Sequence, residues 1–384
     1  MSDPRTRIEV IDVTRGLVMV LMALDHVRDL LHVTSISQQP TDLNTTHTAL
    51  FFTRWITHLC APTFVFLSGV SVWLALRRSG SMAETRKFLI SRGVILILVE
   101  FTLVNFGLWF DIRFGVFLFD VIAAIGTGFI ILGLLLGQSE KVIGVLGLAI
   151  IFLHNLTALV PSPPGALISF LFAPGALPLS DGHIFVMGYP PIPWLGIMLA
   201  GFAAGKWFNH DTTARKQHFL TAGLSALALF LVLRALNLYG DTFPWSAQKS
   251  GWFSVLSFIN VTKYPPSLDF ILLFLGLMFL LMYLLDGKVS RWTNYLRAFG
   301  TVPLFYFVVH WYLIHPIMFA MVFLQGFTAN DLVFGFNFGR PKEGSGLELG
   351  AVYLVWIGVV VALYPICKWY GRYKEQRRGW TRYF

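Results

Sequence analysis

Residues 10–33, VIDVTRGLVMVLMALDHVRDLLHV, indicate the architecture because they are long and apolar enough to cross a membrane yet carry several charges. An ionisable group at the centre of a bilayer-spanning helix costs about 2.5 to 3.5 kcal/mol, so such groups usually face a bundle interior or a wet cavity. We therefore expect this segment to be a helix inside a membrane-embedded bundle. Its polar side chains are Asp12, Arg15, Asp25, His26, Arg28 and Asp29.

The composition predicts a polytopic membrane protein. Of the 384 residues, 56% are hydrophobic and only 13% are charged, whereas soluble domains have about 25% charged residues. Segments of about 20 mostly apolar residues suggest about ten spans in an all-α transmembrane bundle, which we treat as a single domain over residues 1–384. The expected spans are 10–33, 50–76, 88–110, 114–136, 141–160, 190–208, 218–238, 267–286, 299–324 and 347–370.

The distribution of basic residues predicts the orientation. With ten spans and the amino terminus inside, most of the 29 Lys and Arg residues fall on the inner side, as cytoplasmic loops require. Both termini are therefore expected in the cytoplasm. The net charge of +9 lies mainly in these loops and the C-terminal tail, which favours contact with anionic lipid headgroups over nucleic acid. Neither Cys60 nor Cys367 has the spacing of a zinc site, and we expect no metal.

Helical spacing predicts a cluster of acid, base and cation. Asp25 shares a helix face with Arg28 and Asp29, because residues three or four apart are neighbours. The next span contributes Arg54 and His58 at a similar depth, since it enters from the opposite side. A carboxylate beside an imidazole can prepare a general base. The residues alone leave three alternatives: a structural polar network, catalysis, or a proton relay in a transporter.

Two similar motifs, Gly188-Tyr189-Pro190-Pro191 and Lys263-Tyr264-Pro265-Pro266, each precede an apolar span. Proline suits the first turn of a helix, so both motifs are expected to begin helices at the outer face. Alternatively, the helix ends and Lys263 hold an anionic part of a ligand.

Tyr306 and His310 are four residues apart in another apolar span. A lone histidine in such a span often forms a hydrogen bond between helices. The alternative is that His310 lines a ligand-binding site.

Ordered motifs lie along nearly the whole chain. They are Asp12-Val13-x-Arg15-Gly16-Leu17, Leu24-Asp25-His26, Phe52-Thr53-Arg54-Trp55-Ile56-Thr57-His58-x-Cys60-Ala61-Pro62, Tyr189-Pro190-Pro191-x-Pro193-Trp194, Lys263-Tyr264-Pro265-Pro266-Ser267 and Pro303-Leu304-Phe305 followed by His310 and His315. Together these motifs resemble the bacterial branch of the heparan-alpha-glucosaminide N-acetyltransferase-like membrane proteins.

This resemblance implies transfer of an acyl group from acetyl-CoA, as co-substrate, to an amine or hydroxyl of a sugar-like acceptor. The family's functional asparagine corresponds to His26 here. The family's functional histidine corresponds to Thr48, one residue from His47, so its role falls to His47 or passes to His58. We favour His58 because it lies on a helix with Arg54.

We therefore predict a membrane acyltransferase of the bacterial plasma membrane that acts on a glycan or small-molecule acceptor, with homo-oligomers left open. His58, oriented by Asp25, is the expected base, with His47 as the alternative, and Arg54 and His26 are expected to stabilise the oxyanion. The alternative function is a proton-coupled secondary transporter. Residues expected to bind substrate are Asp29, Lys263, Tyr264, Tyr306 and His310, and Lys263 or inner arginines are expected to hold the CoA phosphates.

Overall fold

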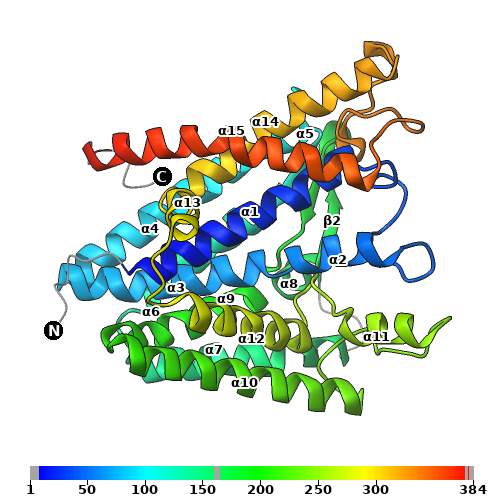
Figure 1. The fold of residues 1–384 in the computed structure, drawn as a ribbon. Helices are drawn as coiled ribbons and strands as arrows, with labels where there is room; N and C mark the ends of the chain where they lie inside the picture. The colour runs from blue at the N-terminus through cyan, green and yellow to red at the C-terminus, as the bar shows by residue number, and fades with distance from the viewer. Residues whose placement is uncertain (1–7, 160–164, 377–378, 380–384) are drawn as a thin grey trace.

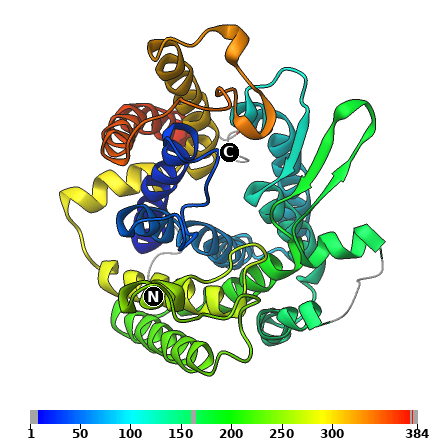
Figure 2. The same cartoon turned by 90° about the vertical axis from the view of Figure 1, so that its right-hand side faces the viewer.

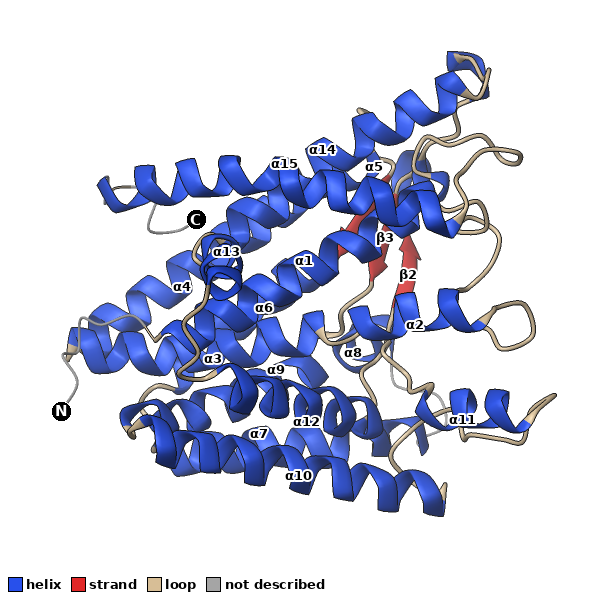
Figure 3. Ribbon diagram, in the orientation of Figure 1, coloured by secondary structure: helices blue, strands red, loops and turns tan. Residues whose placement is uncertain are grey.

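The computed structural model describes residues 8–159, 165–376 and 379, and it is a bundle of helices with one small sheet (Figure 3). The predicted all-α membrane-type bundle is confirmed. The helices of the first half are α1 (Glu9–Leu31), α2 (Thr48–Thr57), α3 (Cys60–Ser79), α4 (Met82–Val99), α5 (Asn105–Trp109), α6 (Val121–Leu135), α7 (Glu140–Leu153), α8 (Gly165–Phe172) and α9 (Pro191–Ala204). Those of the second half are α10 (Thr212–Leu236), α11 (Gly251–Ile259), α12 (Leu268–Leu285), α13 (Arg291–Gly300), α14 (Pro303–Leu324) and α15 (Leu349–Gln376).

Each of the expected spans overlaps at least one helix. Within the described residues, seven helical segments have the length and apolarity to cross a membrane. Helix α1 is not among them because its charged residues exceed what such a segment usually carries. Its beginning and the end of α15 lie together on the left of Figure 1, which we call the termini side. The number of crossings and the cytoplasmic location of the termini stay predictions, and both chain ends lie outside the described residues.

A three-stranded sheet marks the opposite end of the bundle, which we call the sheet side (Figure 1). Strand β1 (Val116–Phe119) runs parallel to β3 (Ile184–Met187), and β2 (Gly175–Pro178) pairs with β3 in the antiparallel sense. These strands were not predicted. They shorten the expected span 114–136, because only its part from Val121 onward is helical.

The charged helix α1 lies in the middle of the bundle. Viewed from the sheet side, α1 to α3 (blue) are surrounded by the other helices (Figure 2). Helix α1 packs against α13, α14 and α15, and it also contacts α2, α3 and α12. Its residues Val18, Ala23, Val27 and Leu30 are fully buried. The interior position that its charges predict is therefore the one observed.

Two expected helices are each broken near a proline. The expected span 50–76 separates into α2 and α3 at His58 and Leu59. Pro62 explains the break, because proline has no N–H to donate to the carbonyl four residues earlier and its ring crowds that carbonyl. Likewise, the expected span 299–324 is interrupted after Gly300, where α13 ends, and Pro303 occupies the first position of α14. The break at His58 affects where its side chain lies.

The crossing of α1 and α13 depends on glycine. A Cβ atom added at Gly16 would lie 1.8 Å from the carbonyl oxygen of Leu296, so the two backbones are in direct contact there. We expect Gly16→Ala to lower the free energy of unfolding by about 1 to 3 kcal/mol through overpacking. Thermal unfolding in detergent measures this effect. Gly358→Ala in α15 is the matched control, because nothing lies within 4 Å of its added Cβ, and an equal loss in both variants would contradict the assignment.

Candidate functional site

The charged residues of α1 and α2 form one ion cluster. One carboxylate oxygen of Asp25 lies 2.9 Å from Arg28 Nη2, and its other oxygen accepts a hydrogen bond from Arg54. Arg28 also lies 2.6 Å from the carboxylate of Asp29. The Asp25 and Arg28 side chains are almost completely buried, whereas that of Asp29 is 39% exposed. Two arginines thus neutralise two carboxylates at the centre of the bundle.

His26 pairs with His310 of α14 rather than with a carboxylate. The Nδ1 atom of His26 is hydrogen-bonded to Nε2 of His310, and Nδ1 of His310 lies 3.2 Å from the carbonyl oxygen of Tyr306. Because a carbonyl only accepts, Nδ1 of His310 carries the proton, so Nε2 of a neutral His310 accepts from Nδ1–H of His26. We assign this tautomer from the hydrogen bonds. It leaves Nε2 of His26 with a free lone pair.

The ring of His26 stacks on the indole of Trp311, with 4.1 Å between ring centroids and 18° between planes. An aromatic face attracts a cation lying over it. Trp311 is therefore placed to stabilise His26 whenever the imidazole gains a proton.

A cavity of about 590 Å³ on the sheet side contains this cluster. The sheet holds part of its wall in place, because the backbone N–H groups of Gly188 and Tyr189 donate to the Phe119 carbonyl, 3.1 Å away in both cases. Asp120, the residue after β1, thereby lies on the same wall as Tyr189. The polar and aromatic residues lining this sheet-side cavity include Asp25, His26, Asp29, Arg54, Trp109, Asp120, Tyr189, Lys263, Tyr264, Trp311, Phe336 and Phe338.

The two Tyr-Pro-Pro motifs meet at this cavity. The rings of Tyr189 and Tyr264 make an edge contact, with 5.5 Å between centroids. The ammonium of Lys263 lies 5.0 Å from the Tyr264 ring centre and 5.9 Å from that of Tyr189. Burial raises the pKa of Tyr189 well above its usual value, so its phenol stays neutral and supplies no counter-charge to Lys263. A helix follows each motif. Pro191 opens α9 as predicted, whereas Pro265 and Pro266 precede α12, which begins at Leu268 after its N-cap Ser267.

Two further cavities continue toward the termini side. A central cavity of about 40 Å³ shares Asp25, His26 and Lys263 with the sheet-side cavity. It shares Phe64, Val121 and Phe307 with a third, termini-side cavity of about 240 Å³. Arg15 lines that third cavity, and it precedes His26 by a helical rise of about 16 Å. The three cavities therefore form a row along α1.

Basic side chains surround the termini-side cavity. Its lining includes Arg15, Arg92 and Lys374 together with Ser68 and Ser71, and none of the described residues that line it is acidic. Arg15 also donates to the Leu67 carbonyl at 3.0 Å, which holds its guanidinium against α3. A site of this composition favours an anionic ligand.

Some of the predicted site residues lie elsewhere. His58 is not hydrogen-bonded to Asp25, whose oxygens bind Arg28 and Arg54, and its ring instead contacts Phe270 and Phe274 of α12. The expected orientation of His58 by Asp25 is therefore not observed, because the helix ends there and turns the ring toward α12. His47 is exposed and caps α2 by accepting from the Leu50 N–H. Tyr306 is buried and lines none of the three cavities. Its carbonyl reaches Nδ1 of His310, and its ring stacks on the His310 ring with 5.9 Å between centroids.

Several residues around the site were missing from the predicted set. Asp120 and Asn105 had a signal, since each is a polar residue in an apolar segment. Asn105 holds β1 in place by accepting from the Leu118 N–H at 2.7 Å and donating to the Leu118 carbonyl at 3.0 Å. Trp109 and Trp311 had no signal, because tryptophan is common throughout this chain. Within the described residues, no group of three or more His, Cys, Asp or Glu side chains could hold a metal ion.

A helical membrane-type bundle with a buried imidazole, paired charges and a row of cavities has the features of an integral membrane enzyme. Residues 7–241 match the family described as heparan-alpha-glucosaminide N-acetyltransferase, catalytic. The match covers more than half of the chain, and the chain belongs to this family. Membership indicates a membrane acetyltransferase. No match was found among curated proteins.

The matched region contains His26, Arg54 and Asp120 but ends before Lys263 and His310. The last third of the chain therefore completes a site whose core lies in the family region.

Proposed function

We propose that this protein transfers an acetyl or other acyl group from acyl-CoA to an amine or hydroxyl of a sugar-like acceptor, within or across the membrane. The observation that carries the proposal is the pairing of His26 with His310, which leaves one imidazole nitrogen free as a base at the junction of two cavities. Family membership supports the reaction type.

The donor occupies the termini-side cavity, and the acceptor occupies the sheet-side cavity. CoA carries several phosphate charges, and Arg15, Arg92 and Lys374 line the termini-side cavity. These three cations lie on helices α1, α4 and α15, whereas the inner arginines of the prediction were expected in loops. The acyl thioester end reaches His26 through the central cavity. The acceptor meets the aromatic and polar walls of the sheet-side cavity.

In the reaction, the acceptor N–H or O–H loses its proton to Nε2 of His26 as the nucleophile bonds to the thioester carbonyl carbon. Arg54, held by Asp25, stabilises the oxyanion that develops. The C–S bond then breaks, and the CoA sulfur takes the proton from the His26 imidazolium. His310 and Trp311 stabilise that imidazolium by accepting its Nδ1–H and by stacking.

The direct test is turnover by purified protein supplied with acetyl-CoA and glucosamine as the probe acceptor. Release of the CoA thiol together with N-acetylation of the sugar is the expected result. Proton-driven solute uptake in proteoliposomes without thioester consumption would instead identify a transporter.

The donor site has its own test in α15. We expect Lys374→Gln to raise KM for acetyl-CoA about tenfold, since a hydrogen bond to a charged group contributes about 1.5 to 3 kcal/mol. KM for the acceptor should not change. The matched control is Arg372→Gln, an exposed residue two positions earlier on the same helix. An equal effect of both variants would indicate general electrostatics and would contradict a CoA site in this cavity.

A further inference from the structure

Lys263 is a buried cation that lacks an anionic partner. The residue is only 8% exposed and lines both the sheet-side and central cavities. Within the described chain, no carboxylate lies within 4 Å of its ammonium. Of the carboxylates that line the same cavity, Asp25 and Asp29 pair with arginines, and Asp120 forms no ion pair with Lys263. Two tyrosine rings are its neighbours. A buried charge is unfavourable unless it is paired, so this position favours a ligand that brings an anion.

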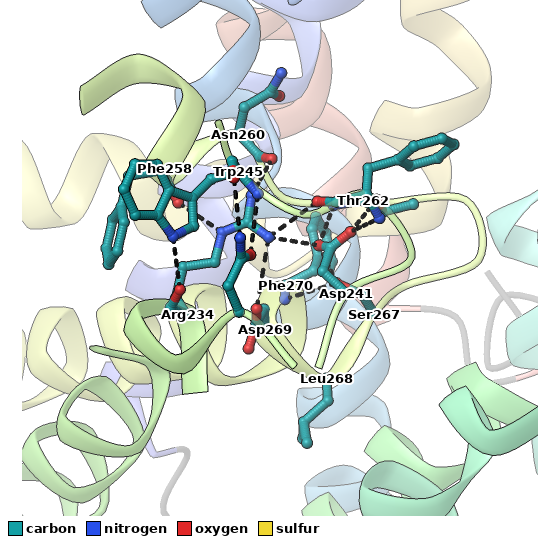
Figure 4. Close-up of polar contacts among 12 residues, drawn as sticks. Arg234, Asp241, Trp245, Phe258, Asn260, Thr262, Ser267, Leu268, Asp269 and Phe270 are labelled. Carbon is teal, nitrogen blue, oxygen red and sulfur yellow. Dashed lines mark hydrogen bonds and ion pairs between the residues drawn. The ribbon is translucent and has the colours of Figure 1, made fainter. Parts of the chain in front are cut away.

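A buried clamp fixes the backbone on the N-terminal side of Lys263 (Figure 4). Arg234, near the end of α10, is 1% exposed and donates to the carbonyl oxygens of Ser257, Phe258 and Asn260 at 3.1, 2.9 and 3.0 Å. These carbonyls belong to the C-terminal end of helix α11. One arginine thus holds the chain that leads into the Lys263 motif.

Asp241 binds residues on both the N-terminal and the C-terminal side of Lys263. Its carboxylate accepts from the backbone N–H of Thr262 at 2.8 Å and from the hydroxyl of Ser267 at 2.8 Å. The Ser267 N–H also donates to the Thr262 carbonyl at 2.9 Å. The residues between these two points are therefore a closed turn. Asp241 itself lies 3.9 Å from Arg234, so the clamp is one connected network.

The turn is also fixed to a neighbouring helix. His154, which follows α7, lies with its Nε2 2.7 Å from the carbonyl oxygen of Pro266. Because hydrogen bonds fix the backbone before and after Lys263, no loop has to become ordered when a ligand binds to its ammonium. Such preorganisation lowers the entropic cost of binding.

We propose that Lys263 binds an anionic group of the acceptor, namely a carboxylate, sulfate or phosphate close to the amine or hydroxyl that is acylated. Arg234 and Asp241 are positioning residues that act through Lys263. The assignment to the acceptor rests on the proposed function. CoA also carries anionic groups, but the termini-side cavity supplies its own basic residues about 16 Å of helical rise away.

The test compares glucosamine 6-phosphate with glucosamine as acceptors. Wild-type protein is expected to prefer the phosphorylated sugar, measured as the ratio of the two kcat/KM values, by about 10- to 100-fold. Lys263→Gln should abolish this preference, and Lys263→Arg should restore most of it. The control is Lys249→Gln, because Lys249 is an exposed lysine of the same outer segment whose ammonium lies over the Phe253 ring. A preference that survives in Lys263→Gln would overturn the proposal.

The clamp is tested with Asp241→Asn and Arg234→Lys. Both variants are expected to raise KM for glucosamine 6-phosphate with little change in kcat, and so to reduce the preference for this sugar. A merely structural role would instead lower the amount of active protein, and the rates with both sugars would fall by the same factor. Asp241→Asn keeps the size of the side chain, so it serves if the arginine variant does not fold. Equal losses for the two sugars in a folded Asp241→Asn protein would exclude a positioning role.

Calorimetric binding to the purified protein separates this proposal from the proposed function. Lys263-dependent binding of glucosamine 6-phosphate without any acyl transfer would support the anion site and reject the acyltransferase. Titration with CoA alone distinguishes the two sources of phosphate. If Lys263→Gln weakens CoA binding and leaves glucosamine 6-phosphate binding unchanged, the anion belongs to the donor and the proposal fails.

Discussion

His26→Ala is expected to lower kcat/KM for acyl transfer by about 10²- to 10⁴-fold, the usual contribution of a positioned general base. His26 lines both the sheet-side and the central cavity, and no other histidine is among the described residues that line them. The variant should still bind acetyl-CoA, because the basic residues at the other end of the row are unchanged. CoA release and calorimetric binding of acetyl-CoA measure the two quantities.

Four further histidine variants make this experiment discriminating. His310→Ala should lower kcat/KM about tenfold, since it removes the hydrogen-bond acceptor that orients His26. His58→Ala should have a smaller effect, because its ring contacts phenylalanines. His210→Ala, at an exposed position, is the control. If activity is lost in His58→Ala and retained in His26→Ala, the base is His58, and loss in His47→Ala alone would move it to the exposed end of α2.

Asp25→Ala is expected to reduce the free energy of unfolding by about 3 to 5 kcal/mol. It leaves Arg28 and Arg54 without the buried carboxylate that both of them contact, and an uncompensated buried charge is strongly destabilising. Thermal and denaturant unfolding in detergent micelles give the change. The protein that remains folded should also have lost activity, because Arg54 is no longer held.

Two comparisons isolate the ion pair. Asp29→Ala should lower the free energy of unfolding by at most about 1 kcal/mol, because the Asp29 side chain is 39% exposed. The double variant Asp25→Leu with Arg54→Leu should be more stable than Asp25→Leu alone. It removes both partners of the ion pair, so Arg54 is no longer left as a buried charge without its carboxylate. Additive losses in the double variant would show that the Asp25–Arg54 contact does not carry the effect.

The sequence was sufficient for the parts of the site that are close to one another along the chain or at equal depth. Asp25 and Arg28 share a helix face by spacing alone, and the structure joins them. Arg54 reaches Asp25 because both lie at a similar height in adjacent helices. Depth follows from counting residues along a helix, so the amino-acid sequence is enough to estimate it.

The side chain of His58 shows where spacing was insufficient. His58 lies four positions after Arg54, which predicts a shared helix face, yet Arg54 contacts α1 while His58 contacts α12. The helix ends between them, and Pro62 was the signal for that end. The small sheet was missed for a different reason, because strands of four residues carry too little periodicity to be recognised.

From the amino-acid sequence alone it follows that this chain is a membrane-type helical bundle, that its charged first helix belongs in the interior, and that it resembles the family to which it belongs. Length, apolarity and the cost of exposing charge to lipid are properties of each segment, so they are readable one segment at a time. The pairing of His26 with His310, 284 residues away, and the meeting of the two Tyr-Pro-Pro motifs around Lys263 are visible only in the folded chain. The reason is that α14 is apolar on every side, so the rotation that turns His310 toward α1 is set by how neighbouring helices pack.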